Sequence, residues 1–265
     1  MQHLFSTMKK PLSFLLVLVG FIMPQMAFSW GMTGHRVIGK IAEMNLGKHA
    51  IKNLNQVLDN ASVSMVSNWG DFVKSDSVWA YTATWHYKDL PAGLSREEFN
   101  KQAITLDNGE VVYRVLQLIA ELKKKPDNAD NLKMLIHLIG DMHQPLHMGH
   151  PEDKGGNMIK IRWMGRETNL HSLWDSGLIE FQQLSYTEYA DYLFKTHTFA
   201  LPHFKPSMVF DWAWGTYQAA QKVYGSVGQL KNPFNYDYRY ISLLESRLTD
   251  AGDHLAIVLN YLYNK

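Results

Sequence analysis

Histidine and aspartate side chains at regular spacing give this sequence its clearest chemical signal. In the stretch Leu135–His150, LIHLIGDMHQPLHMGH, His137 and Asp141 are four residues apart, so on a helix both side chains lie on one face. Pro145 should end or bend that helix, and His147 follows on the turn. Imidazoles and a carboxylate are ligands that a zinc ion accepts. Taken alone, the stretch fits a metal site and a helix with ordinary surface histidines equally well.

The same spacing occurs again further along the chain. His171 and Asp175, in NLHSLWDSG, are also four residues apart. Two such pairs and a further histidine favour a metal site over two helix-surface pairs. Asp71, His86 and His35 are additional candidates, although each alone could equally be a solvated helix residue or a loop histidine bonded to the backbone.

Residues 1–29 predict a signal peptide that is cleaved from the mature protein. Lys9 and Lys10 precede a short apolar run at 12–23, which is too short to span a bilayer comfortably because about 20 residues are needed. The Ala-Phe-Ser sequence at 27–29 places small residues where a signal peptidase cleaves. Cleavage there would make Trp30 the N-terminus, and we expect a periplasmic or secreted protein. An uncleaved membrane anchor is the competing interpretation.

The composition restricts both the substrates and the metal ligands. Without the two lysines of residues 1–29, the chain has 24 basic and 25 acidic residues, a formal net charge of −1. This balance excludes a strongly basic nucleic-acid clamp, so bound metal would have to supply much of the positive charge if nucleic acid binds. The chain has no cysteine, so a zinc site would have to use His, Asp and Glu side chains.

Helical periodicity dominates the mature chain, residues 30–265. The pattern predicts one helix within 30–47 and further helices at 49–58, 62–75, 110–124, 129–144, 171–182, 187–197, 207–224 and 238–263. Thr33 is the predicted N-cap of the first helix, and Gly47 its end. Residues 79–108 are predicted to be a loop, and 153–170 a short hairpin. The sequence therefore predicts an all-α fold, with one mainly helical domain that carries a short β-hairpin.

The chain resembles the zinc-dependent S1/P1 nuclease family at motifs that occur in the same order. The matching motifs are Trp30 with His35, Trp69-Gly70-Asp71, His86-Tyr87-Lys88-Asp89, His137-Leu138-Ile139-Gly140-Asp141, Gln144-Pro145-Leu146-His147, Gly155-Gly156-Asn157, Asn169-Leu170-His171-Ser172-Leu173-Trp174-Asp175 and the C-terminal RLTDAGDHLAIVLN. They cover nearly the whole mature chain, and the absence of cysteine is as expected of the bacterial branch. The resemblance implies a phospholipase C/P1 nuclease-like fold with three zinc ions (Zn2+) at the bottom of a cleft.

The resemblance also implies which residues hold these ions. The ligands implied for the first ion are Asp71, His86, His137 and Asp141. Those implied for the second ion are Asp141, His35, and the α-amine and carbonyl oxygen of Trp30. The third ion would be held by His147, His171 and Asp175. Two neighbouring zinc ions can hold a hydroxide between them and direct it at phosphorus. Asp141, which would be shared by two ions, and Lys74, near the phosphate, are the implied catalytic residues. Lys74 is equally well interpreted as a solvated helix lysine.

The implied substrates are single-stranded DNA and RNA, cleaved to 5′-nucleotides, and 3′-nucleotides. Tyr87 corresponds to an aromatic residue that stacks on a base, and such stacking favours unpaired strands. Asp89, Gly155 and Asn157 resemble residues that contact base edges, although the two glycines at 155–156 also suit a tight turn into the hairpin. We expect a monomer without stable membrane association after signal cleavage.

Two other functions compete with a nuclease. A zinc phospholipase C shares the helical scaffold and the N-terminal Trp, but the Tyr87 and Asp89 pocket favours nucleotides. A non-catalytic exported protein that binds zinc is the third possibility.

Overall fold

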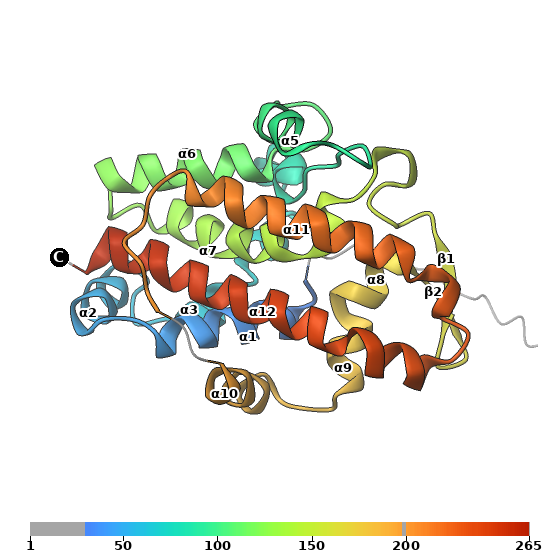
Figure 1. Ribbon diagram of the computed structural model, residues 1–265. Coiled ribbons are helices and arrows are strands. Elements are labelled where there is room, and N and C mark those ends of the chain that lie inside the picture. The colour runs from blue at the N-terminus through green and yellow to red at the C-terminus, as the bar shows by residue number, and fades with distance from the viewer. Residues whose placement is uncertain (1–29, 198–199, 265) are drawn as a thin grey trace, which may run out of the picture.

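The computed structural model describes residues 30–197 and 200–264, so the predicted signal peptide lies outside the described residues. Within these ranges the chain is mainly α-helical, and its one sheet is a two-stranded antiparallel hairpin (Figure 1). The predicted all-α fold class with a short hairpin is therefore confirmed. None of the described helices is both long enough and apolar enough to cross a membrane.

Three helices form the centre of the molecule: α1 (Met32–Met44), α7 (Ala129–His143) and α12 (Pro233–Tyr263). The long α12 packs against both of the others (Figure 1). All three contribute fully buried apolar side chains such as Ile41, Leu138 and Leu255. The apolar residues recur with helical period, so each helix presents one continuous apolar face to the core. This core thus holds α1 and α7, which carry His35, His137 and Asp141, in fixed positions.

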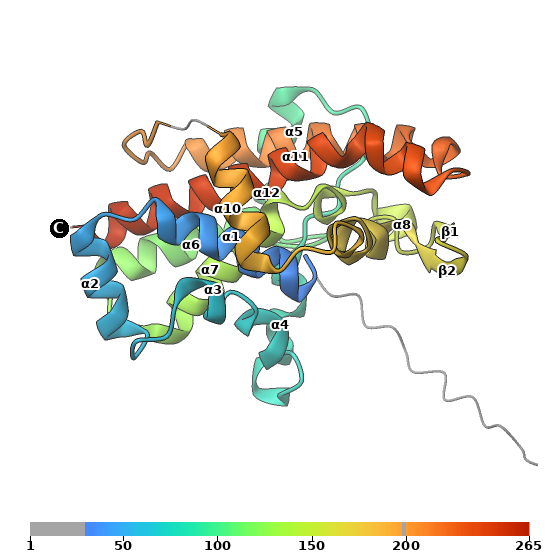
Figure 2. The same ribbon diagram turned by 90° about the horizontal axis from the view of Figure 1, so that it is seen from below.

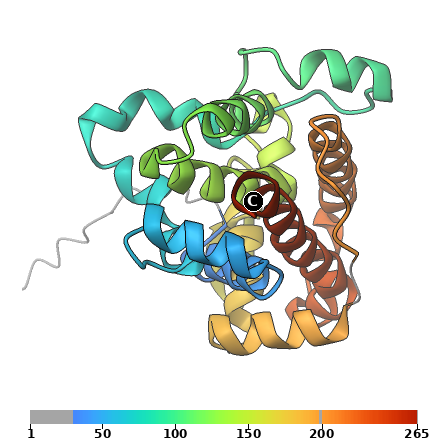
Figure 3. The ribbon, with the colours of Figure 1, turned by 90° about the vertical axis from the view of Figure 1, so that its left-hand side faces the viewer.

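The remaining helices surround this centre. Their bounds are α2 (Lys48–Val57), α5 (Arg96–Gln102), α6 (Val111–Lys124), α10 (Tyr186–Thr196) and α11 (Met208–Gly225). α6 packs against α7, and α10 against α1. Figures 1 and 3 together show that α10 runs roughly across the direction of α12, closing one side of the bundle.

The predicted first helix begins earlier and ends earlier than expected. Gly31, not Thr33, is its N-cap, and the helix stops at Met44 because Asn45 caps it. Gly47 instead precedes α2, where its N–H donates to the side chain of Asn260 on α12.

The predicted helix at 62–75 is two short helices, α3 (Val63–Val66) and α4 (Trp69–Val73). The Ser62 side chain caps α3 by accepting a hydrogen bond from the Met65 N–H. The break between α3 and α4 leaves the Ser67 carbonyl available, and it accepts from His137. The interruption therefore provides a backbone acceptor for His137, a residue of the candidate site.

The prediction of a loop at 79–108 is wrong in two places. Residues Ser77–His86 form a 3-10 helix, η1, and Arg96–Gln102 form α5. α5 begins with a capping box in which Ser95 and Glu98 satisfy each other's backbone N–H groups. Scattered aromatic residues hid the first of these helices, because its apolar residues follow no helical period.

The predicted hairpin is confirmed as β1 (Lys160–Trp163) paired with β2 (Arg166–Asn169). It leads into one helical run made of α8 (Leu170–Ser172), η4 (Leu173–Gly177) and α9 (Leu178–Phe181). η4 is a π-helical turn, a feature that often marks functional sites. Three short 3-10 turns complete the described structure: η2 (Pro145–Met148), η3 (Pro151–Asp153) and η5 (Val227–Gln229).

Candidate metal centre

Histidine and aspartate side chains gather into three groups whose geometry could hold metal ions. Within each group the potential ligand atoms all lie within 4.8 Å of one another. The groups are His35 with Asp71 and His137, His86 with His137 and Asp141, and His147 with His171 and Asp175. Together they contain all eight side chains that the sequence suggested as ligands. The grouping differs from the predicted ligand sets in two respects. Asp71 lies with His35 rather than with His86 and Asp141, and His137 rather than Asp141 is common to the first two groups.

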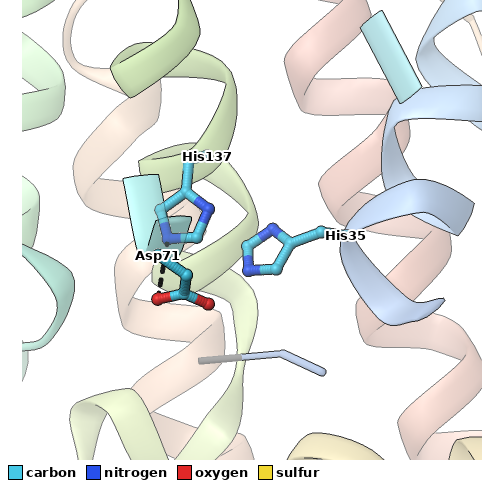
Figure 4. A group of neighbouring side chains, drawn as sticks. All are labelled: His35, Asp71 and His137. Carbon is cyan, nitrogen blue, oxygen red and sulfur yellow. Dashed lines mark ion pairs between the residues drawn. The ribbon is translucent and has the colours of Figure 1, made fainter. Parts of the chain in front are cut away.

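The first group combines side chains from three helices, α1, α4 and α7. Figure 4 shows His35 from α1 and His137 from α7 pointing toward one another, with Asp71 of α4 below. The two imidazole rings stack with their centroids 4.1 Å apart, and His137 Nε2 lies 3.6 Å from Asp71 Oδ1. A Cβ atom at Gly140 would lie only 2.7 Å from His35 Nδ1, so a glycine there gives the histidine room against α7.

Asp141 lies at the centre of the first two groups and is fully buried. Its Oδ1 is 3.3 Å from His35 Nε2, and its Oδ2 is 2.8 Å from His86 Nδ1 and 3.1 Å from His137 Nε2. Burial alone would raise the pKa of this carboxyl, but the charge of His137 and hydrogen bonds from the three histidines hold it well below its usual range. Asp141 is therefore an anion that contacts both groups, as a shared ligand would require.

The third group forms where the chain leaves α7 and where it enters the π-helical turn. His171 Nε2 is 3.2 Å from Asp175 Oδ2, and His147 Nε2 is 3.8 Å from Asp175 Oδ1. The rings of His147 and His171 stack with centroids 5.1 Å apart. Burial raises the pKa of Asp175 well above its usual range, and a hydrogen bond from the Gln144 side chain opposes that rise. Sequence reasoning assigned no role to Gln144, although the Gln-Pro-Leu-His motif contains it.

Backbone carbonyl groups orient three of the histidines. The Nδ1 atoms of His137, His147 and His171 lie 2.8, 2.7 and 2.7 Å from the carbonyl oxygens of Ser67, His86 and Gly155. Each of these bonds fixes the ring and directs Nε2 toward the carboxylates, an arrangement that commonly supports metal-binding histidines. Gly155 takes part through its carbonyl, and its φ of +59° is a left-handed conformation that favours glycine.

The protonation of these histidines also suits a cation. Burial lowers the pKa of His86 to about 4, that of His147 to about 3 and that of His171 to about 4. At neutral pH these imidazoles are uncharged and can offer a lone pair. The buried Nε2 of His86 has no hydrogen-bond partner among the described residues. Neutral imidazoles, carboxylates and a ring nitrogen without a partner fit a divalent metal ion.

A cavity of about 440 Å³ opens beside these groups. It is lined by His86, His147 and His171, and by Lys74, Ala83, Tyr87, Asp89, Leu146, Lys154 and Asn157. We refer to it as the substrate cavity. A larger cavity of about 780 Å³ lies between the ends of α1 and α12, and it contains none of the residues suggested by the sequence.

The structure places the other suggested residues as follows. Lys74 lines the cavity with its ammonium 2.7 Å from Asp71 Oδ1. Asp89 also lines the cavity, and burial with the nearby charge of Asp153 raises its pKa to about 7. Asn157 is on the wall, where its amide donates to a backbone carbonyl, whereas Gly155 is buried and does not line the cavity. Lys154, exposed and next to that glycine, is a lining residue that sequence reasoning missed.

Trp30 is buried at the start of the described chain. Its indole Nε1 donates to the Gly140 carbonyl over 2.9 Å, and the Gly31 N–H donates to the Asp175 carbonyl over 2.8 Å. These bonds anchor the chain start between α7 and the π-helical turn, next to the candidate ligands. The ligand role suggested for the Trp30 backbone stays a prediction.

Known proteins match this chain along most of its length. The S1/P1 Nuclease family matches residues 30–264. Endonuclease 4 of Arabidopsis thaliana is 26% identical over 282 residues, covering 90% of each chain, and Endonuclease 2 of the same plant is 27% identical over 274 residues, covering 88% of this chain and 90% of its own. Nuclease S1 of Aspergillus oryzae is 26% identical over 163 residues, covering 59% of this chain and 56% of its own. The chain therefore belongs to the S1/P1 nuclease family, hydrolases that act on the phosphoester bonds of nucleic acids.

Proposed function

We propose that this protein is an exported phosphodiesterase that uses three zinc ions to hydrolyse single-stranded DNA and RNA to 5′-nucleotides, and that it also removes phosphate from 3′-nucleotides. One observation carries the proposal: eight His and Asp side chains from seven helical elements form three adjacent groups beside a cavity that also presents a lysine and a tyrosine. Export rests on the sequence of residues 1–29.

The three groups would each hold one ion, with Asp141 as a ligand common to two of them. Divalent metal ions held there would supply Lewis-acid stabilisation of the phosphate and activation of water. The chain itself positions the histidine ligands His137, His147 and His171 through buried hydrogen bonds to the backbone carbonyl groups of Ser67, His86 and Gly155. Such preorganisation keeps the ligands in place without a rearrangement when substrate arrives.

Lys74 and Tyr87 would bind the substrate. The ammonium of Lys74 lies at the cavity wall beside Asp71, where it can supply a positive charge to a phosphate oxygen. The half-buried ring of Tyr87 offers a face on which a base can stack. Asp89 and Asn157 on the same wall supply polar groups for base edges. A base must be unstacked from its neighbours to enter this cavity, which favours single strands over duplex.

The test uses mature protein that starts at Trp30 and is loaded with zinc. Its substrates are single-stranded DNA, RNA, 3′-AMP and phosphatidylcholine, and mass spectrometry identifies the ends of the products. The proposal expects cleavage of both nucleic acids with 5′-phosphate ends and release of phosphate from 3′-AMP. Hydrolysis of phosphatidylcholine alone would make the protein a phospholipase. Stoichiometric zinc with every substrate intact would make it a non-catalytic zinc-binding protein.

A further inference from the structure

Four aromatic side chains on the segment from α4 to the end of η1 form a continuous series of rings. The ring centroids of Trp69 and Trp79 are 4.9 Å apart, those of Trp79 and Tyr81 are 6.0 Å apart, and those of Tyr81 and Trp85 are 5.4 Å apart. We refer to these residues as the aromatic ladder. None of the four is among the fully buried core residues, and Tyr81 is 61% exposed.

The segment that carries the ladder lies at the side of the molecule. Figure 2 shows α4 and the chain that follows it projecting from the helical body, away from α12. Phe72 and Val78 on the same segment are 76% and 70% exposed, so this segment presents further apolar side chains to solvent. Exposed aromatic and aliphatic groups concentrated in one place commonly mark a binding surface.

Positively charged groups lie at the two ends of the ladder. Lys133 Nζ is 5.2 Å from the centroid of the Trp69 ring, and Arg114 Cζ is 4.3 Å from the centroid of the Trp85 ring. Each cation also pairs with a nearby carboxylate. These carboxylates offset much of the charge, so the ring faces rather than the net charge would provide most of the binding.

The ladder is continuous with the substrate cavity. Lys74 follows α4, Ala83 and His86 belong to η1, and Tyr87 comes directly after it, and all four line that cavity. The same short stretch of chain thus forms one wall of the cavity and carries the ladder, in which Tyr81 is exposed and the three tryptophans are partly buried against the core. A polymer that is held in the cavity and extends past this wall would meet the ladder next.

We propose that the aromatic ladder is a stacking track for the unpaired bases of a single-stranded nucleic acid whose scissile phosphate lies in the substrate cavity. The inference rests on the proposed function. Every base has a face that stacks on an aromatic ring, so such a track accepts any sequence, and one stacked base changes affinity by about fivefold or more. Tyr81, the most exposed ring of the ladder, is the residue that a base reaches most easily.

The experiment compares Tyr81→Ala, Tyr81→Phe and the control Tyr238→Ala in the zinc-loaded, full-length mature protein. Tyr238 is an 84% exposed tyrosine on α12 that does not line the substrate cavity, so it matches Tyr81 in chemistry and exposure. Fluorescence anisotropy measures binding of a labelled, hydrolysis-resistant phosphorothioate strand of about twelve deoxythymidines, a length that spans a typical single-strand site. A second assay measures kcat and KM for the dinucleotide TpT and for the unmodified long strand.

The track predicts a specific set of results. Tyr81→Ala should weaken binding of the long strand and raise its KM by about fivefold or more, and leave KM for TpT unchanged, because a dinucleotide does not extend past the cavity. Tyr81→Phe and Tyr238→Ala should both behave as the unaltered protein. Equal binding of the long strand by all variants would overturn the inference.

Two further outcomes separate this inference from the proposed function. A protein that cleaves no nucleic acid, but whose strand binding still weakens in Tyr81→Ala, would refute the proposed function and retain the track. Sedimentation of the unaltered protein with phosphatidylcholine vesicles, lost in Tyr81→Ala while strand binding is unaffected, would make this surface a lipid-docking face and overturn the track.

Discussion

Replacement of Gln144 by leucine should selectively weaken metal binding at the group formed by His147, His171 and Asp175. The Gln144 side chain is fully buried; its amide donates to Asp175 Oδ1, and its carbonyl oxygen accepts from the Leu146 N–H. Leucine has a similar volume but can make neither bond. The carboxylate then loses the one hydrogen bond that opposes the effect of burial on its pKa.

The expected size follows from these contacts. A supporting hydrogen bond to a metal ligand is worth about 10- to 100-fold in metal affinity, which is about 1.4–2.7 kcal/mol. The pKa of Asp175 should rise further, so zinc binding at this group should require a higher pH in the variant. Leaving the buried Leu146 N–H without a partner should also lower the free energy of unfolding by about 1–3 kcal/mol.

The assay titrates zinc-loaded protein with a chelator at several pH values and counts the zinc that remains by elemental analysis. Gln182→Leu is a matched control, because the Gln182 amide also donates to an aspartate, Asp237, but lies away from the three groups. Gln144→Leu should lose one zinc at a chelator concentration about 10- to 100-fold lower than the control does. Equal zinc retention by the two variants across the pH range would refute the proposed support of Asp175.

Three further predictions concern separate parts of the molecule. Asp141→Asn should abolish cleavage and lower the bound zinc, because it removes the charge that contacts His35 and two other imidazoles; full activity measured on single-stranded DNA would rule out a shared carboxylate. Burial lowers the pKa of His143 to about 3, so this residue binds a proton in the unfolded chain below its ordinary pKa of 6.5 but not in the folded protein. Its contribution to stability is therefore lost as the pH falls through 6.5, by about 2 kcal/mol at pH 5, and urea unfolding of His143→Gln should show a shallower pH dependence than the unaltered protein. Lys88→Met should lower the free energy of unfolding by about 1–3 kcal/mol without loss of zinc, because the buried ammonium donates to the Thr105 carbonyl and hydroxyl; unchanged thermal unfolding would contradict this.

Sequence spacing predicted those parts of the site that depend on one helix. His137 and Asp141 lie on one face of α7 because four residues make about one turn, and His171 and Asp175 meet for the same reason although a π-helical turn intervenes. The spacing could not indicate that His35 would stack on His137, because that contact depends on how closely α1 approaches α7. Only tertiary packing determines it.

Supporting residues were harder to predict than ligands. Nothing in the local pattern distinguishes Gln144 from a polar residue at the end of a helix, since its role depends on Asp175, 31 residues further along the chain. The capping box of Ser95 and Glu98, by contrast, is a local sequence signal of a helix start, and the loop prediction for 79–108 overlooked it. The division of 62–75 into α3 and α4 is accompanied by a tertiary hydrogen bond between the Ser67 carbonyl and His137, a contact that no helical period reveals.

The most direct test of a trinuclear zinc centre is a zinc count by elemental analysis on mature protein that begins at Trp30, with cleavage of single-stranded DNA measured on the same sample. A second preparation should carry one additional residue before Trp30, which removes the α-amine from the position that the family resemblance assigns to a ligand. A trinuclear centre predicts about three zinc ions per chain, cleavage that a chelator abolishes, and loss of both one zinc and the activity in the extended form. Fewer than about two zinc ions in a folded, active protein would contradict it.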